Sequence, residues 1–191
     1  MKYFFIILYL LININFSHSA QKDKAYFAGG CFWCVEESFE KLKGVEEVIS
    51  GYSGGITENP TYKEVTYGNT GHFEVVEIIY DKKVISFEEL LENFWVNIDP
   101  FDAYGQFCDK GYSYRSVAFY TNDDEKDLIE KDIEKLESRF NKKVVTYVRN
   151  FKKFYKAEEY HQDFYKIKLE RYLRYKKACG REETLKRIWS Q

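Results

Sequence analysis

Apolar residues along this chain are grouped into short runs typical of strands and into stripes at helical spacing. The short runs predict strands at residues 25–28, 45–52, 72–80, 116–121 and 144–148. The stripes predict helices at residues 35–42, 86–95 and 123–139. Ser86 with Glu89 three residues later is a capping box at the start of the second helix, and Asp99-Pro100 ends that helix.

Two stretches have little regular patterning. Residues 100–114 form a long loop rich in Tyr, Gly, Asp and Phe, and such loops in compact domains tend to carry function. Beyond residue 151 we expect short helical pieces near 158–170 and 181–189 in an otherwise irregular C-terminal tail. Because strands and helices are mixed without a strict βαβ repeat, the expected fold is α+β: a two-layer, ferredoxin-like sandwich of a mixed sheet and flanking helices.

The first twenty residues differ from the rest. A short positive start, Met1-Lys2, precedes an apolar stretch over 3–16, and small or polar residues follow at 17–21. This layout is typical of a secretory signal peptide and is short for a membrane span. We therefore expect a signal peptide at 1–20, one mature domain at 21–191, and an exported protein, periplasmic or secreted. An uncleaved leader that anchors the chain is the alternative.

Composition narrows the class of protein. The chain has 191 residues, which favours one domain, and 19% of them are aromatic, so the core and any pocket will be rich in rings. The formal net charge is −2, which gives no case for a nucleic acid or an anionic surface as partner.

Two cysteines three residues apart follow a pair of glycines, in the stretch Gly29-Gly30-Cys31-Phe32-Trp33-Cys34. Cys31 is expected at a turn from strand to helix, where free backbone N–H groups and the helix dipole favour a thiolate. A single cysteine is more often a small buried apolar residue. The glycines, the cysteine spacing and the helix start coincide here, so we interpret Cys31 as a nucleophile.

Glu74 is the strongest candidate to act beside Cys31. Strand alternation places Phe73 and Val75 on one face and Glu74 on the other. If that second face is buried, the pKa of Glu74 is raised and its carboxyl can hold a proton for donation. Further polar candidates for the same pocket are Tyr62, His72, Asp109 and Tyr114.

Four motifs occur in order along the chain: Gly30-Cys31-Phe32-Trp33, Asn59-Pro60-Thr61-Tyr62, Thr70-Gly71-His72-Phe73-Glu74 and Tyr114-Arg115-Ser116. Together they resemble the A type of peptide methionine sulfoxide reductase, over nearly the whole chain from about residue 24. The resemblance implies the family's own α+β fold. It also implies reduction of methionine-S-sulfoxide, free or in proteins, to methionine, and hence repair of oxidised proteins. We expect a monomer.

The resemblance also implies residue roles. Cys31 corresponds to the catalytic cysteine that attacks the sulfoxide sulfur, and Phe32 and Trp33 to the substrate-binding residues that hold the methyl group on that sulfur. Glu74 corresponds to the acid that delivers a proton to the sulfoxide oxygen.

The remaining roles concern the oxygen and the reductant. Tyr62 and Tyr114 correspond to hydroxyl donors to the sulfoxide oxygen, and Asp109 to a polar residue that helps to place the substrate. Attack leaves Cys31 as a sulfenic acid, which a second thiol converts to an intramolecular disulfide. Thioredoxin or a similar dithiol then regenerates the enzyme. No metal and no bound organic cofactor are expected.

The resolving thiol has more than one candidate in this sequence. Cys34 stands where many members of the family have Gly, and it lies one helical turn from Cys31. Cys179 lies in a tail that could fold over the pocket. Cys108, the third candidate, lies beside a loop of the pocket, but it stands where the family usually has Asn, and we interpret it as a simple replacement for that residue. We rank Cys34 first and Cys179 second.

Other classes of protein would use parts of the same pattern. A thiol–disulfide oxidoreductase would also place Cys-x-x-Cys after a strand, and a hydrolase could pair Cys31 with His72 or His161. A structural zinc site is poorly supported, because the chain has only one Cys-x-x-Cys pair. A binding module would explain the aromatic pocket but not the environment of the thiol.

Overall fold

The computed structural model describes residues 21–190. The signal peptide expected at 1–20 therefore lies outside the described residues. Within 21–190, no helix combines the length and the apolar character that crossing a bilayer requires.

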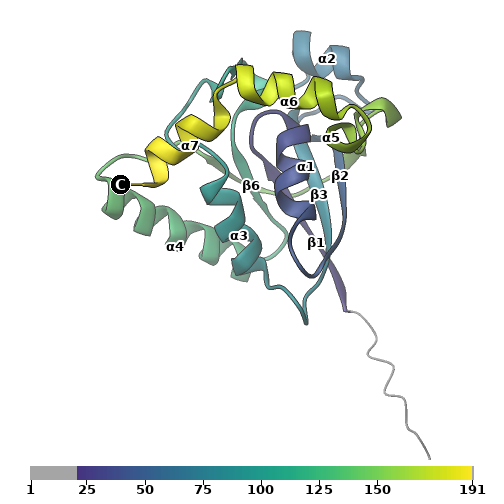
Figure 1. The fold of residues 1–191 in the computed structure, drawn as a ribbon. Coiled ribbons are helices and arrows are strands. Elements are labelled where there is room, and N and C mark those ends of the chain that lie inside the picture. Colours follow the sequence, from purple (N-terminus) through teal and green to yellow (C-terminus); the bar gives the residue numbers. More distant parts are fainter. Residues whose placement is uncertain (1–20, 191) are drawn as a thin grey trace, which may run out of the picture.

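A mixed six-stranded sheet forms the centre of the molecule (Figure 1), with strands in the order β7-β6-β1-β3-β2-β8. Its members are β1 (Lys22–Ala28), β2 (Val45–Ser53), β3 (Phe73–Asp81), β6 (Val117–Tyr120), β7 (Tyr147–Asn150) and β8 (Phe154–Lys156). Only the β6–β7 pair is parallel, and the other neighbours in this sheet are antiparallel. The strands β1 and β3 are thus central; β1 leads into the turn that holds Cys31, and β3 carries Glu74 near its start.

Helices pack against one face of this sheet. They are α1 (Phe32–Glu40), α2 (Tyr62–Tyr67), α3 (Phe87–Val96) and α4 (Asp123–Phe140), followed in the C-terminal part by α5 (Phe164–Ile167), α6 (Leu169–Ala178) and α7 (Arg181–Trp189). In Figure 1, α1 lies in front of the sheet, α3 and α4 lie beside it, and α6 crosses the end of the molecule where α1 begins. The mixed sheet with flanking helices confirms the α+β fold.

The main core lies between the sheet and the helices α1 and α3. The ring of Phe27 on β1 lies 5.5 Å from that of Phe39 and 4.8 Å from that of Phe94, measured between centroids. On β3, Val76 and Ile78 belong to this core, whereas Phe73 and Val75 belong to a second cluster on the opposite face. The predicted alternation of β3 is therefore correct, and it places Glu74 on the face that α1 covers.

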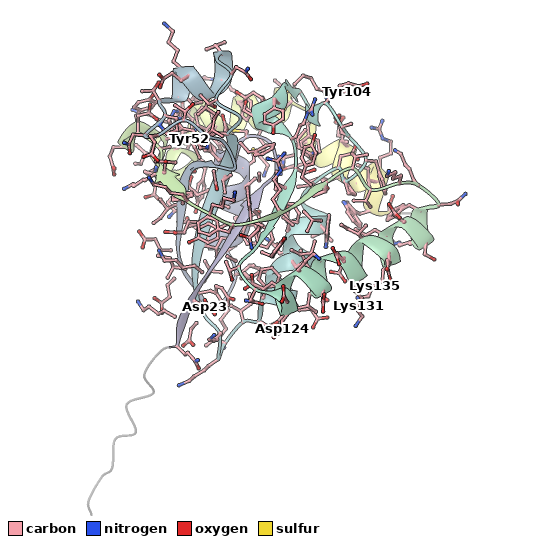
Figure 2. All side chains as sticks on the ribbon, turned by 180° about the vertical axis from the view of Figure 1, so that it is seen from behind. Asp23, Tyr52, Tyr104, Asp124, Lys131 and Lys135 are labelled. Carbon is pink, nitrogen blue, oxygen red and sulfur yellow. A yellow bond between two sulfur atoms is a disulfide. The ribbon has the colours of Figure 1, made fainter. Side chains whose placement is uncertain are left out.

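The charges of α4 form a solvated outer face. Figure 2 labels Asp124, Lys131 and Lys135 along this helix, and all three are exposed. Its buried residues include Ile129 and Leu136. Packing of this apolar stripe holds the helix, while its Asn122 side chain caps the first turn by accepting from the Glu125 N–H.

Three segments are more regular than the sequence predicted. Residues 62–67, expected as loop, form α2, which begins with a capping box between Thr61 and Glu64. The loop at 100–114 contains a small hairpin of β4 (Gly105–Gln106) and β5 (Asp109–Lys110) and a 3₁₀ turn at Tyr112–Tyr114. The tail, expected to be irregular, is largely helical, because buried Tyr172 fixes α6 against the body of the protein.

The turn from β1 into α1 requires glycine. Gly30 has a φ of +82°, and a Cβ added there would lie 2.6 Å from the Cβ of Gln106. A Cβ on Gly29 would lie 2.9 Å from Ile98. This closely packed turn places Cys31 just beyond the end of the central strand β1.

We expect Gly30→Ala to destabilise the protein more than Gly180→Ala does. Gly180 also has a positive φ, +64°, but a Cβ there would meet nothing within 4 Å. Gly180→Ala should therefore show only the cost of a left-handed residue, about 1–2 kcal/mol, and Gly30→Ala should add the clash with Gln106. Urea unfolding of both variants measures the difference. Equal losses would mean that Gln106 moves away at no cost.

Candidate active site

Cys31 lies where the sequence predicted it, at the turn between strand β1 and helix α1. It is the N-cap residue of α1, and its carbonyl oxygen accepts from the Cys34 N–H at 3.1 Å. Its side chain is almost entirely buried, with the residue 5% exposed. Any substrate must therefore reach the sulfur through the small cavity beside it.

That cavity has a volume of about 60 Å³. Its lining residues are Cys31, Phe32, Trp33, Tyr62, Glu74, Asp109, Tyr114 and Tyr175. They come from α1, α2, β3, β5, the 3₁₀ turn and α6. The fold thus brings together seven residues that the sequence singled out, at positions 31–33, 62, 74 and 109–114 of the chain.

Tyr175 is the lining residue that the sequence reasoning missed. It is one of 17 tyrosines, and it lies in a tail whose helix was not predicted. Its position one helical turn before Cys179 was the available signal. The Tyr175 hydroxyl donates to the carboxylate of Asp109, so it also orients a second lining residue.

Glu74 is held at the base of the cavity by the first turn of α1. Its Oε2 accepts from the Phe32 N–H at 3.0 Å, and the residue is 2% exposed. Burial raises the pKa of this carboxyl to about 8, although the Phe32 N–H and the Tyr114 hydroxyl act in the opposite direction. The raised value keeps Glu74 protonated at neutral pH, and its proton is lost only as the pH rises through about 8.

Two phenol groups lie next to this carboxyl. Tyr62 and Tyr114 line the same cavity, and burial beside Glu74 raises the pKa of both hydroxyls. Both hydroxyls stay protonated at neutral pH and remain donors. The α2 helix that carries Tyr62 is tied to the C-terminal part by the Tyr62 N–H, which donates to Glu158 at 2.9 Å.

Aromatic rings form the wall around Phe32 and Trp33. The Trp33 ring stacks on Phe164 with centroids 3.8 Å apart, and its Nε1 donates to His161 Nδ1 at 3.2 Å. The His161 ring also lies 4.9 Å from that of Phe32. This wall suits a small apolar group and excludes water.

The electrostatics of the cysteine pair correct one expectation. Cys31 and Cys34 are close enough for the charge of each thiol to affect the pKa of the other. Burial, the neighbouring Cys34 and the nearby Glu74 and Asp109 raise the pKa of Cys31 well above its usual value. The helix N-terminus therefore does not make Cys31 a thiolate in this state, because burial and acidic neighbours outweigh it.

Cys34 is the more acidic thiol of the pair. The neighbouring Cys31 thiol, the Arg181 and Lys176 charges and the Tyr172 hydroxyl lower its pKa to about 7, against the effect of burial. Arg181 is only 4% exposed, and its guanidinium donates to the carbonyls of Gly29 and Asn97. These neighbours favour a negative charge on Cys34 over one on Cys31.

The other two cysteines are bonded to each other. Cys108 and Cys179 form a disulfide, whereas Cys31 and Cys34 are free. In this state the second-ranked resolving candidate, Cys179, has no thiol to offer. Cys108, which we interpreted as a replacement for Asn, has a covalent partner that the sequence did not predict.

The histidines do not support a hydrolase. Neither His72 nor His161 lines the cavity of Cys31. His72 bonds the Gly55 N–H and the Thr57 carbonyl, and burial lowers the pKa of His161 to about 4. Both rings are thus engaged in packing and hydrogen bonds.

In residues 21–190, two groups of side chains bring possible metal-ligand atoms within 4.8 Å of one another. The first group is Cys108, Asp109 and Cys179, and the second is Glu36, Glu40 and Asp163. In the first group the two sulfurs are consumed by the disulfide. In the second, Lys166 pairs with Glu40 and Asp163. Both groups are satisfied by protein partners.

Comparison with known sequences identifies the family. Residues 23–191 match the family model of peptide methionine sulfoxide reductase. Peptide methionine sulfoxide reductase MsrA of Listeria monocytogenes is 49% identical over 169 residues, which cover 87% of this chain and 96% of the relative. The enzyme of the same name from Bacillus velezensis is 46% identical over 173 residues, 90% of this chain and 98% of the relative.

Solved structures agree in fold. The reduced form of Mxr1 from Saccharomyces cerevisiae is 32% identical with a TM-score of 0.71, covering 75% of this chain and 84% of that one. Methionine sulfoxide reductase A of Corynebacterium diphtheriae is 30% identical with a TM-score of 0.69, covering 75% of this chain and 74% of that one. With its motifs, its cavity and these likenesses, the chain belongs to the peptide methionine sulfoxide reductase family, in its A branch.

Proposed function

We propose that this protein is a peptide-methionine (S)-S-oxide reductase, which reduces methionine-S-sulfoxide, free or in proteins, to methionine and so repairs oxidised proteins. One observation carries the proposal. The buried carboxyl of Glu74, with its pKa raised to about 8, lines the same small cavity as the free thiol of Cys31. A proton donor and a sulfur nucleophile are the two groups that removal of a sulfoxide oxygen needs.

The first step joins the Cys31 sulfur to the sulfoxide sulfur. A sulfoxide oxygen leaves poorly until it is protonated, so Glu74 gives it a proton while the Tyr62 and Tyr114 hydroxyls donate hydrogen bonds. The Cys31 thiol loses its own proton to Cys34, the neighbouring thiol whose pKa is lowered to about 7. The oxygen moves to Cys31 as a sulfenic acid, and the reduced thioether, methionine, is released.

The substrate's remaining groups are placed by the cavity wall. Phe32 and Trp33 offer the apolar surface for the methyl group on sulfur. Asp109, oriented by the Tyr175 hydroxyl, is placed to accept a hydrogen bond from the polar part of the substrate.

Cys34 resolves the sulfenic acid in our proposal. Its sulfur attacks the Cys31 sulfur, the S–O bond breaks, and the hydroxyl leaves as water with the Cys34 proton. The free thiol of Cys34, one helical turn from Cys31 and with a lowered pKa, supports this choice, as does the engagement of Cys179 with Cys108. A dithiol such as thioredoxin then reduces the Cys31–Cys34 disulfide by exchange. No bound cofactor enters these steps.

We further propose that the chain acts as a monomer and is exported after cleavage of residues 1–20. The leader-like pattern of these residues supports export, and a disulfide such as Cys108–Cys179 is typical of oxidising compartments. The first residue of the protein recovered outside the cytoplasm tests the cleavage.

Cysteine variants test the order of thiol chemistry. With methionine-S-sulfoxide and no reductant, the wild-type chain should release one methionine and form a Cys31–Cys34 bridge. Cys34→Ser should still release one methionine but keep a sulfenic acid that a 1,3-diketone traps, and Cys31→Ser should release none. Chromatography of methionine and mass mapping of the sulfurs give both readouts, with the R epimer as control substrate. A bridge in wild type that lacks Cys34 would contradict the assignment.

Glu74→Gln tests the proton donor. Gln is neutral and nearly the same shape, so the fold should persist, but the rate of methionine release in one turnover should fall by roughly a hundredfold. The wild-type rate should decline as the pH rises through about 8, where Glu74 loses its proton, and the variant should lack this decline. Rapid-quench rates from pH 6 to 9 measure both. A variant as fast as wild type at neutral pH would show that another group supplies the proton.

A further inference from the structure

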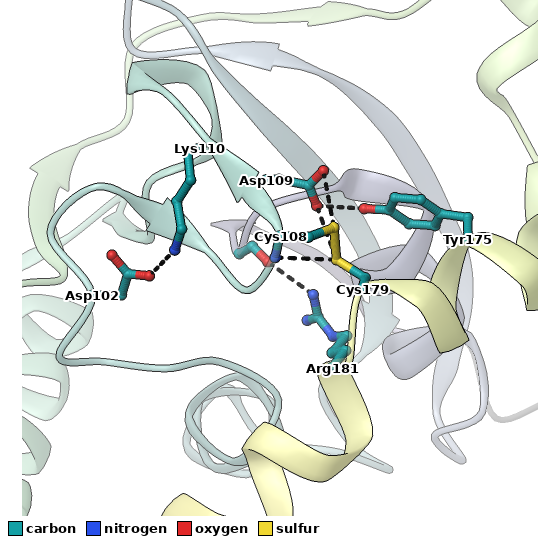
Figure 3. Close-up of a disulfide and its surroundings, with 8 residues drawn as sticks. Asp102, Cys108, Asp109, Lys110, Tyr175, Cys179 and Arg181 are labelled. Carbon is teal, nitrogen blue, oxygen red and sulfur yellow. Dashed lines mark hydrogen bonds and ion pairs between the residues drawn. A yellow bond between two sulfur atoms is a disulfide. The ribbon is translucent and has the colours of Figure 1, made fainter.

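A second cysteine pair borders the catalytic cavity and has no part in the chemistry proposed above. The Cys108–Cys179 disulfide links the turn of the β4–β5 hairpin to the residue that follows α6, across a sequence separation of 71 residues (Figure 3). The hairpin and the helix also meet through the hydrogen bond from the Tyr175 hydroxyl to Asp109. The disulfide therefore connects two parts of the cavity wall.

Each half of the disulfide is next to a residue that lines the cavity. Cys108 immediately precedes Asp109, and Cys179 follows Tyr175 by one helical turn. Figure 3 shows the Tyr175 hydroxyl directed at the Asp109 carboxylate, with Cys179 beside it. Cys179 Sγ lies 3.9 Å from Asp109 Oδ2 and 3.2 Å from the Cys108 N–H. The hairpin that carries Asp109 and the helix that carries Tyr175 are thus joined by a hydrogen bond between these two residues and by the Cys108–Cys179 disulfide.

The hairpin has few other restraints at this point. β4 and β5 have two residues each and pair with each other, not with the six-stranded sheet. Gln106 anchors the first strand through its bonds to the backbone of Asp99. On the second strand, the restraints on Asp109 are the Tyr175 hydroxyl and the disulfide, because Lys110 pairs with Asp102 within the same loop.

We propose that the Cys108–Cys179 disulfide is a clamp that positions Asp109 and Tyr175 for substrate binding, separate from the catalytic cysteine pair. This inference rests on the proposed function, since it concerns the same cavity. Reduction of the clamp by a dithiol gives two thiols and an oxidised dithiol. The hairpin and the end of α6 are then held together by non-covalent contacts alone, and the substrate binds more weakly.

Substrate binding with the catalytic pair removed isolates the clamp. In a Cys31→Ser/Cys34→Ser chain, the clamp is the remaining redox-active group. Isothermal titration with methionine-S-sulfoxide should give a Kd about tenfold higher after dithiothreitol treatment, the size expected when a charged hydrogen-bonding partner is misplaced. The matched control adds Cys108→Ser and Cys179→Ser. It should bind weakly with and without dithiothreitol, and unchanged near-ultraviolet circular dichroism should show that it is folded.

The outcomes separate the clamp from the proposed function. Equal affinity before and after reduction, with the Cys108 and Cys179 thiols detected by alkylation, would overturn the clamp alone. Absence of binding in the oxidised double variant would overturn the proposed substrate, and the clamp with it. Release of two methionines per fully reduced wild-type chain, with both pairs oxidised, would make the second pair an electron relay and would also overturn the clamp.

Discussion

The hydrogen bond from the Phe32 N–H to the Glu74 carboxyl is the contact on which the site depends. It joins the central strand β3 to the first turn of α1, one residue beyond Cys31. A carboxyl this deeply buried is costly when ionised, and it is tolerated because it stays protonated at neutral pH. The group that fixes the distance between strand and helix is therefore also an acid with a proton to give.

The position of α1 against β3 also decides which charged side chains surround the two free cysteines. Glu74 and Asp109 lie on the side of Cys31 and oppose a negative charge there, whereas Arg181 and Lys176 lie on the side of Cys34 and favour one. These charges favour a protonated Cys31 in the resting state, and in the proposed reaction it loses its proton as the substrate is protonated. A sulfur kept as a thiol at rest is also less readily oxidised than a thiolate.

The sequence could predict features that depend on residues close together in the chain, and it could not predict features that depend on residues far apart in the chain. Period-two alternation correctly placed Glu74 opposite Phe73 and Val75, because it depends on neighbouring residues alone. The helix α2 was missed because six residues show no periodicity, although Thr61 and Glu64 have the spacing of a capping box.

Long-range effects were beyond reach of the sequence. The raised pKa of Cys31 depends first on burial by the folded chain and then on neighbours that include Glu74 and Asp109, which lie 43 and 78 positions along the chain from it. Reasoning from the helix N-terminus alone therefore gave the wrong sign. The partner of Cys108 could not be deduced either, because it depends on where α6 ends.

The ionisation of Glu74 tests the central claim most directly. With ¹³C-labelled glutamate, the carboxyl resonance that disappears in Glu74→Gln can be followed as a function of pH in the chain without substrate. The account predicts a midpoint near 8, so that the carboxyl is protonated at neutral pH. A midpoint near the ordinary value of 4.5 would mean that Glu74 is ionised where the enzyme works, and would contradict its role as the proton donor.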